Sequence, residues 1–524
     1  YSSAASDVYK RQLLNIRIVE ALDWLVIGVF FLALIGIIVW VVRQKQNDSA
    51  DYFLGGRDAT WLAIGASIFA SNIGSEHLIG LAGAGASSGM AMAHWEIQGW
   101  MILILGWVFV PFYSRSMVYT MPEFLERRYN PQSRTILSVI SLVSYVLTKV
   151  AVTVYAGGLV FQQVFGIKEL WGIDFFWIAA IGLVVLTALY TIFGGMKSVL
   201  YTSVLQTPIL LLGSLIILVL GFKELGGWDE MMRVCGAVTV NDYGDTMTNL
   251  IRSNDDANFP WLGALIGSAI IGFWYWCTDQ FIVQRVLSGK NEKEARRGTI
   301  FGAYLKLLPV FLFLIPGMIA FALHQKYIGA GGEGFLPMLA NGTANADAAF
   351  PTLVAKLLPA GVKGLVVCGI LAALMSSLAS LFNSSAMLFT IDFYKRFRPE
   401  TPEKKLVGIG QIATVVIVIL GILWIPIMRS VGDVLYTYLQ DVQSVLAPGI
   451  AAAFLLGICW KRTSAQGGMW GLISGMVIGL TRLGAKVYYS NAGEVADSTF
   501  KYLFYDMNWL FFCGWMFLFC IIVV

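Results

Sequence analysis

Charged residues are scarce in this chain. Asp, Glu, Lys and Arg make up 13% of its 524 residues, against roughly 25% in soluble domains. Hydrophobic residues reach 57%. The composition therefore predicts an all-α polytopic membrane protein. The small net charge of +4 gives no indication of nucleic-acid binding.

Paired cysteines and a cleavable leader are also missing. The six cysteines are scattered without a CxxC pair, which argues against a metal site or a disulfide framework. No nucleophile–base pair or cluster of metal ligands appears, so an enzyme is the least favoured class. The first apolar run, about 20 residues long, is predicted to be an anchor. Residues 1–20 are interpreted as foreign or extracellular, and the end, which stops inside an apolar run, as truncated.

Long apolar runs, in contrast, occur throughout the chain. A helix needs about 20 such residues to cross the hydrocarbon core, and about thirteen runs of this kind can be drawn. Their limits are 21–43, 60–85, 91–114, 135–163, 174–193, 198–222, 260–284, 299–324, 362–390, 405–428, 432–460, 466–490 and 505–524. Lys and Arg collect after every second run, which predicts that those loops are cytoplasmic and that the N-terminus is outside.

Two of these runs are interrupted by polar residues. Run 60–85 contains SNIGSEH at 71–77, and run 260–284 contains WYWCTDQ at 274–280. Lipid does not tolerate such groups on a continuous helix, whereas a broken helix can line a binding site with its freed backbone groups. The two runs lie five apart, an odd number, so the halves have opposite orientation. This pattern predicts an inverted five-plus-five repeat, as in secondary transporters.

Run 362–390 carries a stripe of small polar residues. Ala373, Ser376 and Ser377 lie on one helix face,. Close helix packing is one explanation. A Na⁺ site is the other, made by these residues together with carbonyls freed near Ala70 and Ile73, because a hard cation is satisfied by neutral oxygens. The stripe contains no carboxylate, which a proton-coupled carrier would favour.

Several charged or amide side chains lie inside apolar runs and are candidates for binding a solute. They are His77, Glu96, Lys306 and Gln440, with Tyr275 and Trp276 nearby. Such a mixture suits a neutral polyhydroxylated ligand, since each hydroxyl needs a donor or an acceptor and an aromatic face covers a sugar ring. Asp279 and Arg285, six residues apart, are predicted to form a structural ion pair instead.

Five motifs give the chain a resemblance to the sodium/solute symporter family, and within it to the sodium/glucose cotransporter branch. They are ASNIGSEHLIGLAG (70–83), YTIFGGMKSV (190–199), WYWCTDQFIVQR (274–285), ALMSSLASLFNSS (373–385) and FLLGICWKR (454–462). The resemblance implies a LeuT-type fold. It has an extra helix at 21–43, a first repeat at 60–222, an inverted repeat at 260–460 and peripheral helices at 466–524.

The resemblance also assigns site residues. It implies a Na⁺ site at Ala70, Ile73, Ala373, Ser376 and Ser377. It implies solute contacts at Asn72, His77, Glu96, Trp276, Lys306 and Gln440, with Tyr275 closing the inner side and Tyr436 and Leu81 forming an outer lid.

Three positions depart from the family pattern. Gly272 and Gly99 stand where relatives have polar side chains, so some hydroxyl contacts are expected to be absent or replaced. Ser203 replaces a common Asp, which favours one Na⁺ per cycle.

The expected function is uptake of a neutral hexose-like sugar, driven by inward Na⁺ flow through alternating access. A different polyol such as myo-inositol is an alternative substrate. A solute-sensing membrane module and a channel are alternative classes, although a buried mixed-polarity pocket argues against a channel. We expect a multi-pass protein of the inner (plasma) membrane; a monomer is sufficient for transport, and an oligomer is the alternative.

Overall fold

The computed structural model describes residues 20–44, 48–74, 76–339, 342–431, 435–491 and 496–524, and for 147, 163, 427–431, 435–441, 490 and 491 it describes the backbone alone. Apart from loops and isolated bridges, the described chain is helical, with one antiparallel pair of two-residue strands, β1 (Glu169–Leu170) and β2 (Ile173–Asp174). The predicted segment 1–20 lies almost wholly outside the described residues. The predicted all-α class is confirmed.

The helices of the first half are α2 Ala21–Val42, α3 Ser49–Leu54, α4 Trp61–Asn72, α5 Ala82–Ser88, α6 Ala93–Ile97, α7 Met101–Ile104, α8 Val110–Ser116, α9 Met121–Arg128, α10 Pro131–Ser144, α11 Ala151–Phe165 and α12 Phe175–Leu225. Those of the second half are α13 Trp228–Gly236, α14 Trp261–Phe273, α15 Gln280–Leu287, α16 Glu292–Leu305, α17 Ile315–Gly329, α18 Ala349–Leu357, α19 Val362–Met387, α20 Lys395–Phe397, α21 Glu403–Val431, α22 Leu435–Cys459, α23 Ala465–Asn491, α24 Thr499–Lys501 and α25 Trp509–Val523.

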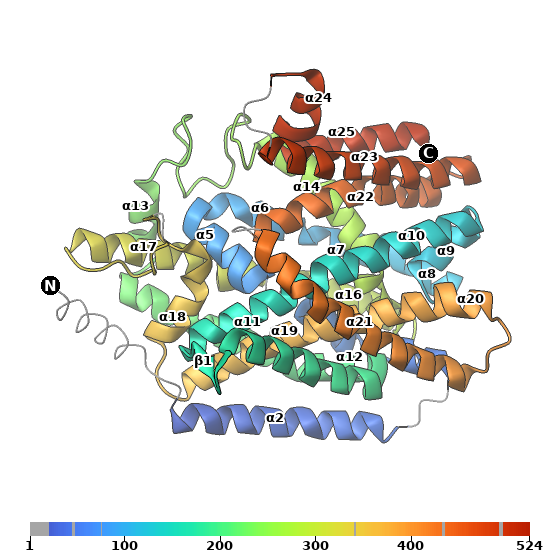
Figure 1. The fold of residues 1–524 in the computed structure, drawn as a ribbon, viewed down its shortest axis with the longest axis horizontal. Coiled ribbons are helices and arrows are strands. Elements are labelled where there is room, and N and C mark those ends of the chain that lie inside the picture. The colour runs from blue at the N-terminus through green and yellow to red at the C-terminus, as the bar shows by residue number, and fades with distance from the viewer. Residues whose placement is uncertain (1–19, 45–47, 75, 340–341, 432–434, 492–495) are drawn as a thin grey trace.

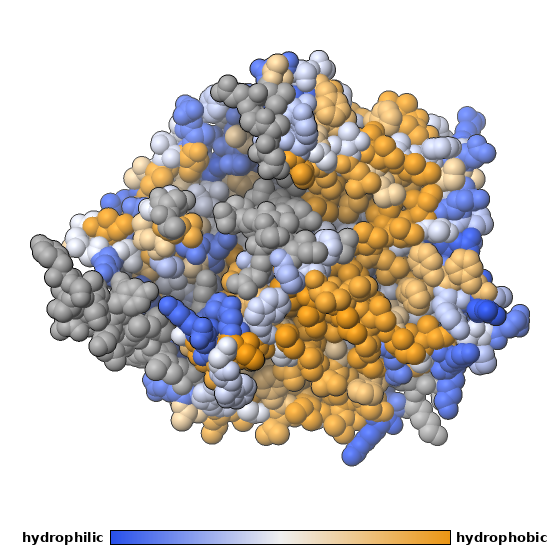
Figure 2. Space-filling model, viewed as in Figure 1, coloured by the Kyte–Doolittle hydropathy of each residue, from blue (hydrophilic) through white to orange (hydrophobic). Residues whose placement is uncertain are grey.

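Most long helices run in a similar direction (Figure 1). On the face shown in Figure 2, hydrophobic residues form a broad area between edges where hydrophilic residues gather. Large apolar side chains are exposed on α2, α12 and α21, for example Leu32, Val219 and Leu423. Exposed apolar surface of this extent is what a lipid-facing protein presents.

Fewer helices qualify as membrane spans by length and composition than the thirteen crossings predicted from the sequence. By length and composition, nine helices of the described chain are able to span a membrane, or ten if the bent pair Thr499–Asp506 and Trp509–Val523 is one span. Part of the difference comes from α12, a run of 51 residues. At 1.5 Å per residue it is more than twice the thickness of a bilayer core. It is kinked at Gly195, whose φ of 54° and ψ of −152° interrupt the helix between the predicted runs 174–193 and 198–222.

Both predicted helix breaks are present. Helix α4 ends at Asn72, Ile73 is extended, and the chain resumes as a π-helix, η2 (Glu76–Leu81). Helix α14 passes into a second π-helix, η7 (Trp274–Thr278), and extended Asp279 then begins α15. In each break a short stretch of backbone leaves the regular hydrogen-bond pattern at membrane depth.

Helix α19 is the central element against which the first break packs. Nearly every residue from Val366 to Met387 is buried. It contacts α12, α4, α2 and α21, so it is enclosed from several sides. Its serine stripe therefore faces protein rather than lipid.

Candidate functional site

The serine stripe of α19 meets the end of α4. Ser377 Oγ donates hydrogen bonds to the carbonyls of Ser71 (2.7 Å) and Ile73 (3.3 Å). These carbonyls belong to the last turn of a helix, where no intrahelical partner is available and the helix dipole is negative. Hydroxyl and carbonyl oxygens thus converge where the sequence predicts a cation site.

The other predicted ion ligands lie close by. Ser376 Oγ is 3.4 Å from Ser71 Oγ and 3.2 Å from Ser203 Oγ. Ala70 and Ala373 are both buried, in the last turn of α4 and one turn before Ser377 in α19. Within the described chain no group of three or more His, Cys, Asp or Glu side chains is placed to hold a metal ion. Neutral oxygens make up this donor set, which fits Na⁺ better than a transition metal.

A buried guanidinium lies next to these oxygens and was not expected there. Arg285 Nε donates to Ser67 Oγ (3.2 Å) and Ser71 Oγ (3.1 Å). The predicted ion pair between Arg285 and Asp279 is wrong, because Asp279 binds Lys149 Nζ at 2.7 Å instead. Lys149 lies on a third π-helix, η6 (Tyr145–Val150), and its nitrogen is 4.6 Å from the centre of the Tyr275 ring.

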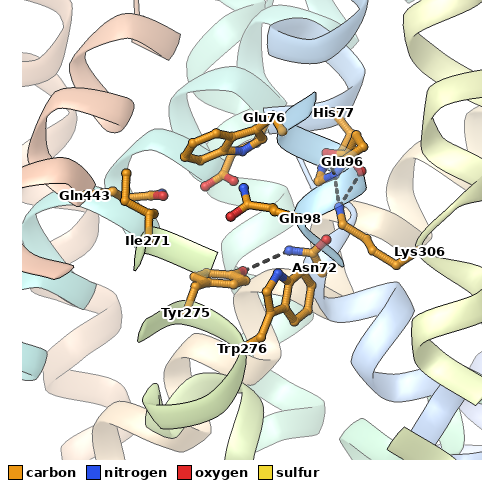
Figure 3. A pocket seen from close by; sticks show the side chains of 11 residues that line it. Asn72, Glu76, His77, Glu96, Gln98, Ile271, Tyr275, Trp276, Lys306 and Gln443 are labelled. Carbon is orange, nitrogen blue, oxygen red and sulfur yellow. Dashed lines mark hydrogen bonds and ion pairs between the residues drawn. The ribbon is translucent and has the colours of Figure 1, made fainter. Parts of the chain in front are cut away.

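Three predicted solute-binding side chains form one buried ion network. Lys306 Nζ lies 2.6 Å from Glu96 and 2.7 Å from His77 Nε2, which is itself 3.2 Å from Glu96. At most 4% of any of these side chains is exposed. They come from η2, α6 and the end of α16, so the network ties the first break to two other segments (Figure 3).

Asn72 and Tyr275 join the two breaks. Asn72 Nδ2 donates to the Tyr275 hydroxyl at 2.9 Å, a contact drawn in Figure 3. Trp276 follows on η7, with its ring 5.6 Å from Lys306 Nζ. The predicted inner aromatic residue is therefore held by a side chain from the first helix break.

These residues line a first cavity with an empty volume of about 320 Å³. The sequence prediction missed Glu76, Trp95, Gln98, Ile271 and Gln443, which also line it (Figure 3). The signal that identified Glu96, a polar side chain inside an apolar run, also applies to Gln98 and Gln443. Leu81 is buried in η2 but does not line this cavity. The side chains of Tyr436 and Gln440 lie outside the described residues.

At Gly99 and Gly272, where hydroxyl contacts were expected to be absent or replaced, the missing Cβ makes room for a polar side chain. A Cβ at Gly99 would lie 2.6 Å from Lys306 Cγ, and one at Gly272 would lie 2.6 Å from Gln98 Oε1. Real Cβ atoms do not approach other atoms this closely, so a side chain at 99 or 272 would require Lys306 or Gln98 to shift.

A second cavity, with an empty volume of about 290 Å³, adjoins the first. Asn72, Glu76 and Tyr275 line both cavities. The other residues around the second cavity are Ser71, Gly74, Lys149, Thr153, Phe281, Ser377 and Leu381. This cavity therefore reaches the candidate ion site.

Comparison with known proteins agrees with the family resemblance of the sequence motifs. The family model described as "Sodium:solute symporter family" matches residues 52–475. The human sodium/myo-inositol cotransporter 2 is 38% identical over 475 residues, which cover 88% of this chain and 69% of the relative. The rat sodium/glucose cotransporter 2 is 38% identical over 512 residues, covering 94% of this chain and 75% of the relative.

Solved structures show the same fold. A Na⁺-coupled sialic acid symporter in a substrate-bound outward-open state superposes with a TM-score of 0.77 at 22% identity, covering 96% of this chain and 97% of the other. MhsT in complex with L-phenylalanine superposes with a TM-score of 0.54 at 11% identity, covering 89% and 99%. The predicted LeuT-type fold is confirmed. The chain is a Na⁺-coupled transporter rather than an enzyme, and it belongs to the sodium:solute symporter family.

Proposed function

We propose that this transporter couples inward Na⁺ flow to the uptake of a neutral hexose-like sugar or a related polyol such as myo-inositol. The first cavity carries the proposal. Its walls offer carboxylate, ammonium, imidazole and amide groups beside the rings of Trp95, Tyr275 and Trp276. Such a set pairs the many hydroxyls of a polyol and stacks on its apolar face.

The charge arrangement favours a neutral solute. Glu96 and Lys306 lie 2.6 Å apart and compensate each other. The ammonium of Lys306, which could otherwise bind the carboxylate of an α-amino acid, is already paired. The names of the two mammalian relatives, which specify myo-inositol and glucose, agree with this choice.

The proposed ion site consists of the Ala70, Ile73 and Ala373 carbonyls and the Ser376 and Ser377 hydroxyls. Na⁺ there would join the end of α4 to α19 and favour the state that binds solute. Asn72, His77, Glu96, Trp276, Lys306 and Gln440 are the proposed solute contacts. Tyr275 is the proposed inner gate, and Tyr436 and Leu81 are the proposed outer lid.

We propose one Na⁺ per solute, since Ser203 brings a hydroxyl rather than a carboxylate to within 3.2 Å of Ser376. One Na⁺ crossing 100 mV releases about 2.3 kcal/mol, and a tenfold gradient adds about 1.4 kcal/mol. The sum sustains roughly 500-fold accumulation of solute. The proposed setting is the plasma (inner) membrane with the N-terminus outside, and a monomer as the transporting unit.

The test is uptake of ²²Na⁺ and radiolabelled solute into proteoliposomes. We expect Na⁺-dependent uptake of glucose, galactose or myo-inositol, with a flux ratio of one, and no uptake driven by K⁺ or a proton gradient. Na⁺-dependent uptake of an amino acid with no response to any of these polyols would refute the proposed substrate class. A flux ratio of two would refute the proposed stoichiometry alone.

A further inference from the structure

The carboxylate of Glu76 lines the first cavity and has no partner within the described residues. Glu76 is the first residue of η2, just after the break that follows α4. It lies in the cavity wall together with Trp95 and Tyr275 (Figure 3). Its side chain is partly exposed, and it forms no ion pair or side-chain hydrogen bond in the described chain. A charged group at membrane depth that no protein group compensates is a candidate for binding a ligand.

The ammonium groups near Glu76 are already neutralised by other carboxylates. Lys306 Nζ lies 2.6 Å from Glu96. Lys149 Nζ lies 2.7 Å from Asp279. Both ammonium groups interact electrostatically with Glu76, but from beyond ion-pair distance. Each belongs to a pair without net charge, so neither compensates the charge of Glu76.

His77 and Arg285 do not supply the missing positive charge either. Lys306 Nζ lies 2.7 Å from His77 Nε2. An ammonium group has only donors, so this ring nitrogen accepts and the imidazole is neutral. Arg285 lines neither cavity, and its Nε donates to two serine hydroxyls of α4. The lining of the first cavity therefore carries a net negative charge, which is located at Glu76.

A solute that fills the first cavity displaces water from this carboxylate. Removing water from a charged group is strongly unfavourable unless the group gains hydrogen bonds and a countercharge. The hydroxyls of a neutral polyol supply the hydrogen bonds alone, whereas an ammonium group on the same frame supplies both. The rings of Trp95, Tyr275 and Trp276 offer aromatic faces, which also attract a cation,. A polyol with one ammonium group therefore matches the cavity better than a neutral polyol.

We propose that Glu76 is a solute-binding residue, and that it extends the substrate range to protonated amino sugars and amino polyols by binding their ammonium group. This inference rests on the proposed function, because the rest of the solute is the same polyol frame. Lys306 is paired and disfavours a carboxylate on the solute, while Glu76 favours an ammonium group. A cationic solute adds one positive charge to those that Na⁺ moves in each transport cycle.

Uptake and charge movement in proteoliposomes that contain the full chain test the proposal. The probes are two matched pairs, glucose with 2-amino-2-deoxyglucose and myo-inositol with an aminodeoxyinositol, at saturating Na⁺ and at a pH that keeps the amines protonated. Glu76→Gln removes the charge and keeps the size of the side chain. Glu76→Asp keeps the charge and remains informative if Glu76→Gln fails to fold. Glu292→Gln is the matched control, because it removes a carboxylate from an exposed pair with Arg296 at 3.7 Å.

For the wild type we expect an apparent KM for the amine no higher than that for its neutral parent, and one additional positive charge moved per molecule of amine. Glu76→Gln should raise the KM for the amine at least tenfold and the KM for the parent less than threefold. Glu76→Asp and Glu292→Gln should both retain the preference of the wild type.

Wild-type uptake of a neutral parent without uptake of its amine would overturn the proposed role of Glu76 and leave the proposed function intact. An equal rise of both KM values in Glu76→Gln would have the same consequence, as would uptake of the amine without additional charge. Absence of Na⁺-dependent uptake of all the probes would overturn this role and the proposed function together.

Discussion

Replacing Glu96 with Gln tests how much the buried ion pair of Glu96 and Lys306 contributes to the free energy of unfolding. The carboxylate is 2% exposed and lies 2.6 Å from Lys306 Nζ. Glu96→Gln keeps the shape but leaves the ammonium without its countercharge in a low-dielectric environment. Removing one partner of a buried ion pair costs about 3–5 kcal/mol, whereas replacing both partners with uncharged groups is often neutral. We therefore expect Glu96→Gln and Lys306→Met each to lose that amount, and the double variant to lose less than either.

The assay is reversible unfolding of the purified protein by SDS in mixed micelles, followed by tryptophan fluorescence. Lys290→Met serves as the control, because Lys290 and Asp58 form an exposed pair at 3.9 Å, and such pairs contribute about 0–1 kcal/mol. Sodium-dependent uptake should be lost in both single variants and in the double variant, since solute contacts are removed. Additive losses of stability in the double variant would show that Glu96 and Lys306 are not coupled, and would refute the reasoning.

Three further variants address the ion site, the gate and the second break. Ser377→Ala should raise the Na⁺ concentration for half-maximal uptake at least tenfold, measured in proteoliposomes, while Ser385→Ala on the same helix leaves it unchanged. Tyr275→Phe removes the hydroxyl that accepts from Asn72, a bond of about 1 kcal/mol, so the apparent KM for solute should rise about fivefold with Na⁺ activation retained. Lys149→Met should destabilise the protein more than a Lys149→Met/Asp279→Asn double variant does, measured by the same SDS titration.

The positions of the helix breaks could be predicted from sequence because they depend on a local difference in polarity between neighbouring residues. Polar residues at 71–77 and 274–280 interrupt otherwise apolar runs, and hydrocarbon penalises that arrangement strongly. Glu96 and Lys306 were identified by the same contrast. Lys149 gives an equal signal inside run 135–163, so the sequence also contains the information that identifies it.

The partners of buried ion pairs, and the side chains that fill the space beside glycines, could not be predicted in this way. Asp279 and Arg285 are near in sequence, yet Asp279 binds Lys149 from another helix. Contacts at Gly99 and Gly272 were expected to be absent or replaced, but the sequence did not indicate that Lys306 and Gln98 would occupy the space beside them. Which side chain fills the space left by a missing Cβ depends on how the helices cross. A single sequence does not directly specify that crossing geometry.

The geometry of the first break gives a physical basis for coupling between ion and solute. Ser71 and Ile73 present their carbonyls to Ser377 on α19, while Asn72 bonds Tyr275 and His77 joins the Glu96 network. One segment of seven residues therefore contacts the candidate ion site on one side and the first cavity on the other. A ligand that fixes this segment against α19 reduces the entropic cost of ordering the segment when the second ligand binds. Linkage makes the effect reciprocal, so each 1.4 kcal/mol of ordering shared through this segment raises the affinity for both ligands about tenfold.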